Sequence, residues 1–197
     1  MCGSGRRSSS SPADVRLDRG PLLLAAQTLA IAAVGVLAGL LLWKLTHQPS
    51  PPRVGQRAPA FSLERLNGSG TVSLASFRGK AVVLNFFASW CTPCKREAPA
   101  LEQVWRDYRS QGVVVLGIDI HDQSSDARRF LAAHGVTYPT LGGASEAMIA
   151  NYGISGLPVT YVLNRHGRVV GGEILGAVSD QPFAEEFDRY LHAALKS

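Results

Sequence analysis

The sequence predicts an α/β fold that follows a single transmembrane helix. Two apolar runs rich in Val, residues 81–87 and 113–118, have the length and composition of buried strands. Between them, apolar residues recur at helical spacing from Ala98 to Tyr108, so the three elements form a strand–helix–strand unit with a right-handed crossover. Upstream, Leu22–Trp43 is almost uninterrupted in its apolar character and is long enough to cross a bilayer.

This apolar segment is expected to be an uncleaved anchor, to which we assign residues 21–45. As a helix it would span about 33 Å, which exceeds a hydrocarbon core of about 30 Å. Four arginines precede it, so the positive-inside rule keeps the N-terminus in the cytoplasm and the following domain on the periplasmic side of the inner membrane. A cleaved signal peptide is the alternative, with residues 36–38 as its cleavage signal. The apolar run continues beyond this point, which favours the anchor.

The remaining segments differ in composition. Residues 1–20 are rich in Ser, Gly and Arg and are expected to form a disordered cytoplasmic tail. Residues 46–53 contain three prolines and are expected to form a stiff, extended linker. Residues 54–197 then form the folded domain, which carries 14 Lys and Arg against 13 Asp and Glu. Because this domain is nearly neutral, the net charge of +5 on the whole chain does not imply a nucleic-acid partner.

Cys91 and Cys94 stand where the first buried strand gives way to the first turn of the helix. Unpaired N–H groups and the partial positive charge of a helix terminus favour a thiolate there, and only the thiolate is a nucleophile. A zinc site would need a second ligand pair, and a haem-attachment site would need His where Lys95 stands. The pair therefore predicts redox chemistry, with Cys91 as nucleophile and Cys94 as resolving cysteine. A purely structural disulfide remains the alternative.

The segment from Leu84 to Lys95, Leu-Asn-Phe-Phe-Ala-Ser-Trp-Cys-Thr-Pro-Cys-Lys, resembles the thioredoxin superfamily. More closely it is similar to the membrane-anchored TlpA/ResA-like thiol–disulfide oxidoreductases of bacteria. The resemblance implies a thioredoxin-like fold, in which helices flank a central mixed β-sheet. It also implies an N-terminal β-hairpin, here around residues 67–70, and a central insertion over about residues 122–147.

A second motif, Gly-Leu-Pro-Val-Thr-Tyr at residues 156–161, adds to this resemblance. It implies that Pro158 is cis and faces the cysteine pair, and that the backbone of Leu157 offers an edge to an extended substrate, as in β-augmentation. Trp90, Leu157 and Pro158 are therefore the expected substrate-binding residues. A trans proline at the start of a strand is the alternative. A strand over residues 168–175 and a helix from Phe183 to Leu195 are expected to follow.

Glu97 follows Cys94 by one helical turn, and in ResA-like proteins a Glu at this place helps the buried cysteine to lose its proton. The alternative is a carboxylate that only the helix dipole stabilises. Asn85 occupies the strand position where thioredoxin has a buried Asp, and an amide does not exchange a proton near neutral pH. The proton relay of thioredoxin is therefore absent, which makes Glu97 its substitute and a third catalytic residue beside Cys91 and Cys94.

These residues predict a membrane-anchored, extracytoplasmic oxidoreductase that exchanges disulfides with protein substrates, and we expect it to act as a reductase. It would need an upstream electron donor in or beyond the membrane, and no metal or cofactor other than its redox-active disulfide. Three alternatives remain open. A DsbE-type reductase of cytochrome c maturation tends to carry Glu where Val159 stands. A peroxiredoxin-like peroxidase wants Thr or Ser where Ala88 stands. A non-enzymatic adaptor would keep the disulfide closed.

Overall fold

The computed structural model describes residues 20–46 and 50–197, and for residues 20–26 it describes the backbone alone. The predicted tail, apart from Gly20, and residues 47–49 of the predicted linker lie outside the described residues. The chain divides after Gln48 into two compact units. The first contains the helix α1 (Gly20–Thr46), and the second, Pro49–Ser197, contains every other described element.

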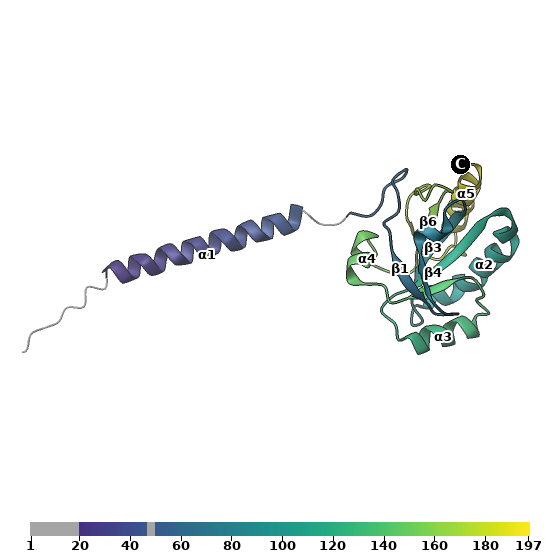
Figure 1. Ribbon diagram of the computed structural model, residues 1–197, viewed down its shortest axis with the longest axis horizontal. Coiled ribbons are helices and arrows are strands. Elements are labelled where there is room, and N and C mark those ends of the chain that lie inside the picture. The colour runs from purple at the N-terminus through teal and green to yellow at the C-terminus, as the bar shows by residue number, and fades with distance from the viewer. Residues whose placement is uncertain (1–19, 47–49) are drawn as a thin grey trace, which may run out of the picture. The chain divides into compact units, whose positions relative to one another are not determined.

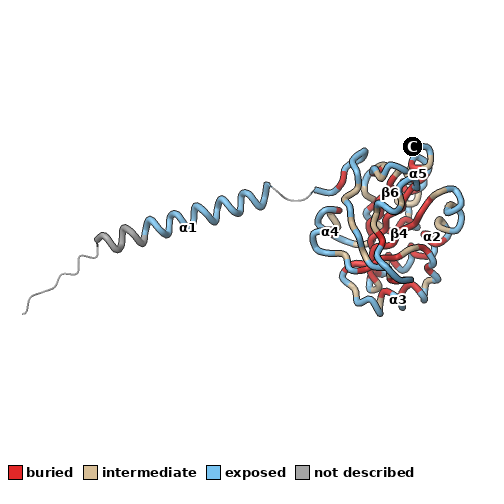
Figure 2. Tube along the Cα trace, viewed as in Figure 1, coloured by how far each residue is buried: buried red, intermediate tan, exposed pale blue. Residues whose placement is uncertain are grey.

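α1 is 27 residues long, which corresponds to about 40 Å. Within it, Gln27–Thr46 has a mean hydropathy of 2.0 and no buried residue. Figure 2 shows this part of the helix as exposed along its whole length, and the exposed side chains include Leu29 and Trp43. No protein surface in the described part of the chain covers these apolar side chains, so α1 is a candidate membrane span by length, composition and exposure.

The second unit is built on one mixed sheet of seven strands in the order β2-β1-β5-β4-β3-β6-β7 (Figure 1). The strands are β1 (Ser62–Arg65), β2 (Thr71–Ser73), β3 (Ala81–Phe87), β4 (Val113–Asp119), β5 (Thr140–Gly142), β6 (Val159–Leu163) and β7 (Ile174–Leu175). β3, β4 and β5 run parallel, whereas β1, β2, β6 and β7 join by antiparallel pairing. This is the thioredoxin-like architecture that the sequence predicts, with an N-terminal hairpin of β1 and β2.

Four helices of this unit cover the two faces of the sheet: α2 (Thr92–Tyr108), α3 (Ser124–Ala133), α4 (Glu146–Asn151) and α5 (Phe183–Lys196). Every residue of β3 is buried, and alternate side chains enter different cores. Val83 and Phe87 pack with residues of α2, α3 and α5, while Leu84 and Phe86 pack on the face of α4. Figure 1 shows α4 and α2 on opposite sides of the sheet. The strand that leads to the cysteines is therefore the buried centre of the fold.

The expected strand over residues 168–175 is wrong as a continuous element. Arg168 and Val169 form isolated bridges, and regular pairing returns only in β7. Between them the backbone bends at Gly171, whose φ is +76°. The ring of Tyr190 from α5 lies so close that any Cβ at this position would collide with it. A left-handed backbone and an overlying ring together interrupt the strand. The region from 122 to 147 forms α3, β5 and the start of α4.

Candidate active site

The two cysteines form a disulfide at the junction between β3 and α2, with their Cα atoms 5.3 Å apart. Cys91 is the N-cap residue of α2, and its Sγ accepts a hydrogen bond from the backbone N–H of Cys94 at 3.2 Å. The partial positive charge of the helix terminus favours an anionic sulfur at this place. Both side chains are buried in the disulfide, with 4% of Cys91 and 1% of Cys94 exposed.

Glu97 lies one helical turn beyond Cys94, and its side chain is buried in the core. One carboxyl oxygen, Oε1, accepts a hydrogen bond from the side-chain amide of Asn85 at 2.8 Å. The other, Oε2, accepts one from the backbone N–H of Val178 at 3.1 Å. Glu97 is therefore not stabilised by the helix dipole alone, because both of its oxygens accept hydrogen bonds inside the protein.

Burial raises the pKa of Glu97 from 4.5 to about 7, because the interior solvates the carboxylate poorly. The two hydrogen bonds oppose this effect, and the charge of Asp180 adds to it. Residues three apart on a helix have Cβ atoms about 5–6 Å apart, so this carboxyl group lies on the helical face that carries Cys94. The site thus combines a disulfide with a group that exchanges its proton near neutral pH.

Asn85 fixes the position of this carboxyl group. It lies in the middle of β3, is 1% exposed, and uses its amide nitrogen twice. One hydrogen bond goes to Glu97, and the other goes to Oγ1 of the buried Thr160 on β6, at 3.0 Å. The sequence indicates Asn85 only as the place where a proton relay is missing. Asn85 also holds the Glu97 carboxyl group in place. The sequence signal for this role is a single amide inside a fully buried strand, because a buried amide needs hydrogen-bond partners.

The loop after β4 holds the segment that precedes Cys91. Oδ2 of Asp122 accepts a hydrogen bond from the backbone N–H of Ser89 at 2.7 Å. The indole N–H of Trp90 points to the backbone carbonyl of His121, at 3.4 Å. The Trp90 side chain is nevertheless 59% exposed, although it is large and apolar. An exposed indole thus stands directly beside the cysteine pair.

Asp119 ends β4 next to this loop, and neither Asp119 nor Asp122 is among the site residues expected from the sequence. Asp119 is 4% exposed, and among the described residues its Oδ1 has no hydrogen-bond partner. Its pKa is raised to about 7, mainly by burial, and the charge of Asp122 and a hydrogen bond with that residue act in the same direction. The sequence does contain a signal for Asp119, which is a charged residue at the end of a buried strand. Because β3 and β4 are parallel, this end lies at the same edge of the sheet as the cysteine loop.

The structure brings Leu157 and Pro158 to the same end of the sheet. The peptide bond between them is cis, as the resemblance implied. In the antiparallel pairing of β3 with β6, Val159 lies opposite Phe86, so Pro158 lies beyond this pair, towards the Cys91 loop. Pro158 is buried, whereas Leu157 is half-buried and packs against the core cluster that contains both cysteines.

Known proteins resemble this chain over the same region. A family model described as the AhpC/TSA family matches residues 54–171. The thiol-disulfide oxidoreductase ResA of Halalkalibacterium halodurans is 34% identical over 135 residues, which are 68% of this chain and 75% of that protein. The chain belongs to the AhpC/TSA family, among the ResA-like thiol–disulfide oxidoreductases. ResA of Bacillus subtilis is also 34% identical, over 116 residues that cover 59% of this chain and 64% of that protein.

Solved structures agree with the fold of this ResA-like chain. A thiol:disulfide interchange protein of the thioredoxin family from Chlorobium tepidum is 33% identical, with a TM-score of 0.61, and covers 74% of this chain and 99% of its own. A second structure from Chlorobium tepidum, named as a thiol:disulfide interchange protein DsbE, is 28% identical, with a TM-score of 0.66. It covers 73% of this chain and 99% of its own.

The ResA-like site therefore consists of a cysteine pair, a buried carboxyl group and its amide partner. An exposed indole and the segment that contains the cis proline complete it. Within residues 20–46 and 50–197, no group of three or more His, Cys, Asp or Glu side chains is arranged to hold a metal ion. This arrangement can carry out proton-coupled exchange of disulfides.

Proposed function

We propose that this ResA-like protein is a membrane-anchored, extracytoplasmic reductase of protein disulfides that works through Cys91 and Cys94 without a cofactor. The buried carboxyl group of Glu97 carries the proposal. A purely structural disulfide does not require a carboxyl group, such as that of Glu97, that lies on the same helical face and exchanges a proton near neutral pH. A resolving cysteine in a poorly solvated place needs such a group.

In the first step, the thiolate of reduced Cys91 attacks one sulfur of a substrate disulfide. The S–S bond of the substrate breaks, its departing sulfur leaves as a thiolate and takes up a proton, and a mixed disulfide forms. Trp90 and the backbone around Leu157 and Pro158 bind the extended substrate on either side of Cys91. The exposure of Trp90 supports this assignment, because a large apolar side chain at a protein surface usually has a binding role.

In the second step, Cys94 transfers its proton to the Glu97 carboxylate and attacks the sulfur of Cys91. The mixed disulfide breaks, and the second substrate thiolate leaves. Two electrons have then passed from the cysteine pair to the substrate, and the Cys91–Cys94 disulfide remains. An upstream membrane or extracytoplasmic electron donor must return two electrons to this disulfide before the next cycle. Glu97 then gives its proton back to Cys94, and Cys91 is again a thiolate.

Two features near the pair favour reduction over oxidation. A strongly oxidising pair has a stabilised thiolate in its reduced form. Here the two residues between the cysteines are Thr92 and Pro93, which carry no positive charge. Glu97, when ionised, adds a negative charge on the helical face of Cys94 and disfavours a thiolate there. The dithiol form is therefore a ready electron donor.

The extracytoplasmic location rests on α1 and on the four arginines that precede it. The helix is long enough to span a bilayer, and the arginines favour a cytoplasmic N-terminus. The Pro49–Ser197 unit would then lie in a compartment where disulfides persist and a reductase of disulfides has substrates.

A partner-specific version of the same chemistry, a DsbE-type reductase of cytochrome c maturation, is the second candidate. The likeness to the DsbE structure from Chlorobium tepidum favours it, whereas Val159 after the cis proline does not. A peroxidase is a weaker candidate, because the buried methyl group of Ala88 stands where that chemistry wants a hydroxyl.

A trapping experiment tests the proposal. Cys94→Ser should accumulate a mixed disulfide with a substrate protein, because Cys91 still attacks and nothing resolves the product. Cys91→Ser is the matched control and should accumulate none. Non-reducing electrophoresis of the full-length variants after incubation with a disulfide-containing protein separates the two. Accumulation by Cys91→Ser alone would contradict the assignment of roles, and accumulation by neither would contradict the exchange.

A further inference from the structure

The end of the Pro49–Ser197 unit that lies away from the cysteines is basic. β3 starts there at Ala81 and leads to the cysteine loop at its other end. Four segments that contain no Asp or Glu meet at this end: residues 50–58, 74–80, 109–113 and 163–169. Backbone hydrogen bonds join them, from Ala58 to Gly167, from Gly79 to Arg165 and from Ala81 to Gly112. The 13 acidic residues of the domain all lie outside these segments, so within a nearly neutral domain these segments carry only positive charges.

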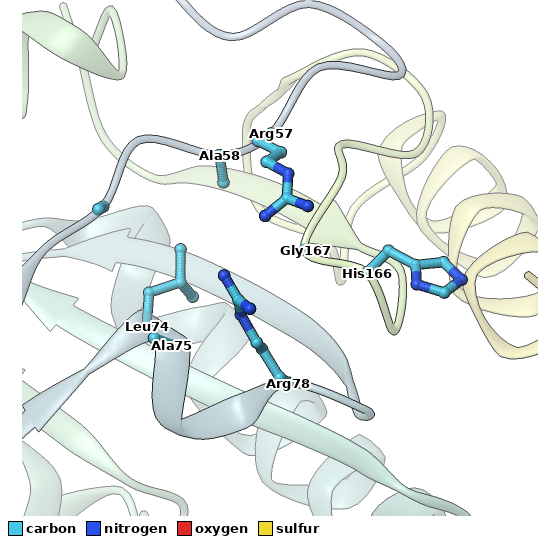
Figure 3. A pocket seen from close by; sticks show the side chains of 8 residues that line it. Arg57, Ala58, Leu74, Ala75, Arg78, His166 and Gly167 are labelled. Atoms are coloured by element: carbon cyan, nitrogen blue, oxygen red, sulfur yellow. The ribbon is translucent and has the colours of Figure 1, made fainter.

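We call this surface the basic face and define it by six exposed cations: Arg53, Arg57, Arg78, Lys80, Arg109 and Arg165. None of them forms an ion pair within the described part of the chain. Figure 3 shows the guanidinium groups of Arg57 and Arg78 turned towards the same pocket, of about 160 Å³, while His166 points away from them. Ser197 lines an adjoining pocket together with Arg57, Arg78 and Arg165. Arg57, Arg78 and Arg165 line neighbouring pockets and have no ion-pair partner among the described residues, so this surface fits an anionic partner.

The covalent chain limits the distance between the end of α1 and the start of the second unit. That helix ends at Thr46, and Pro52 is already buried in the second unit. Three residues later, the N–H of Gly55 donates to the carbonyl of Val169 at 2.9 Å. Six residue steps separate Thr46 from Pro52, so these two residues are at most about 20 Å apart, whatever the orientation of the domain. Arg53 and Arg57 follow immediately in the sequence.

We propose that the basic face docks on the anionic lipid headgroups of the membrane that α1 spans. The inference rests on the proposed membrane anchoring. A short tether holds six unpaired cations within reach of a surface whose potential extends over about a Debye length, roughly 10 Å. Each cation near an anionic lipid surface strengthens such contact roughly fivefold.

Docking in this way also orients the enzyme. The seven residues of β3 run from the basic face towards the cysteine loop, a distance of about 20 Å. Cys91, Trp90 and the Leu157–Pro158 segment then face away from the bilayer, into the compartment that holds the protein substrates. The contact therefore presents the site to soluble partners and keeps the headgroups away from it.

The test uses the full-length protein in vesicles of phosphatidylcholine, with or without phosphatidylglycerol, and measures how fast amine reagents label Lys80. Lys95 is the internal reference, because it is exposed near the cysteine pair. We expect labelling of Lys80, relative to Lys95, to be at least about fivefold slower when phosphatidylglycerol is present, and high salt to abolish the difference.

Two charge-reversal variants complete the test. Arg57→Glu with Arg78→Glu should remove the protection of Lys80. The control variant, Arg129→Glu with Arg189→Glu, makes the same change of net charge on α3 and α5. In this variant Lys80 should remain protected from labelling. Disulfide exchange in detergent reports whether each variant folds. Equal labelling of Lys80 in both kinds of vesicle, or protection that does not depend on phosphatidylglycerol, would overturn the proposal. Protein lost from the vesicles in a salt wash would instead contradict the anchoring on which it rests.

Discussion

Glu97→Gln should remove a steep loss of stability between about pH 4.5 and pH 7. The unfolded chain releases the proton of Glu97 near the ordinary pKa of 4.5, whereas the folded protein releases it near 7. Between these values the folded protein binds more protons than the unfolded chain, so the free energy of unfolding falls as pH rises. This contribution is most favourable below about pH 4.5 and is lost by about pH 7.

The size of the effect follows from the two pKa values. At about 1.4 kcal/mol for each pH unit between them, ionisation of Glu97 lowers the free energy of unfolding by about 3 kcal/mol above pH 7. The substituted amide side chain would be neutral at every pH, but it has only one acceptor oxygen for two donors, Asn85 and the N–H of Val178. The lost partner costs about 1–3 kcal/mol. The variant should therefore be less stable than the natural protein in acid and about as stable, or more stable, near pH 8.

Urea unfolding of the oxidised, full-length protein in detergent, followed by circular dichroism from about pH 4 to pH 8, measures this difference. The cysteines do not titrate while they are disulfide-bonded, and Asp119 titrates in both proteins, so the difference between the two curves isolates Glu97. Glu185→Gln, an exposed change in the first turn of α5, is the matched control and should leave the pH dependence as it is. Parallel curves for Glu97→Gln and the natural protein would refute the reasoning.

Three further outcomes follow from the structure. Glu97→Gln should slow resolution of the mixed disulfide roughly 10²-fold or more near neutral pH and flatten its pH dependence, which stopped-flow reduction of a model disulfide measures; unchanged rates at every pH would make Glu97 a bystander. Asp119→Asn should stabilise the protein by about 1–3 kcal/mol above pH 7 and by little near pH 4, because it removes a buried carboxylate but keeps a donor for Asp122; equal stability in urea at both values would contradict this. Protease added to spheroplasts should degrade the Pro49–Ser197 unit, whereas a shortened, soluble form released without protease would contradict the anchor.

The sequence predicts the centre of this fold well because its signals are local. Residues 81–87 are apolar apart from one amide, and in the structure β3 begins and ends at these same residues. Residues 113–118 are apolar as well, and β4 extends only one residue further, to Asp119. The helix at Ser124 and the final helix are recognisable for the same reason, since their apolar residues recur along one face.

The parts that sequence reasoning misses depend on contacts between distant segments. Tyr190 interrupts the strand at Gly171 from 19 residues away, and no local pattern reports where its ring lies. Glu97 shares the helical face of Ala98 and Leu101, which indicates burial, but its second partner, Val178, is 81 residues away. The pKa of Asp119 is raised mainly by its burial in the folded domain, and the loop after β4 adds the charge and the hydrogen bond of Asp122. Tertiary contacts therefore determine the electrostatics of the site, whereas local sequence determines its scaffold.

The reduction potential of the Cys91–Cys94 pair tests the central claim most directly. The full-length protein in detergent is equilibrated in glutathione buffers of known ratio, and the fraction of disulfide is measured by thiol labelling. Because no positive charge lies between the cysteines and a buried carboxyl group lies on the helical face of Cys94, we predict a potential near that of thioredoxin, about −270 mV. A value near that of a strong oxidant, about −120 mV, would contradict the assignment of this protein as a reductase.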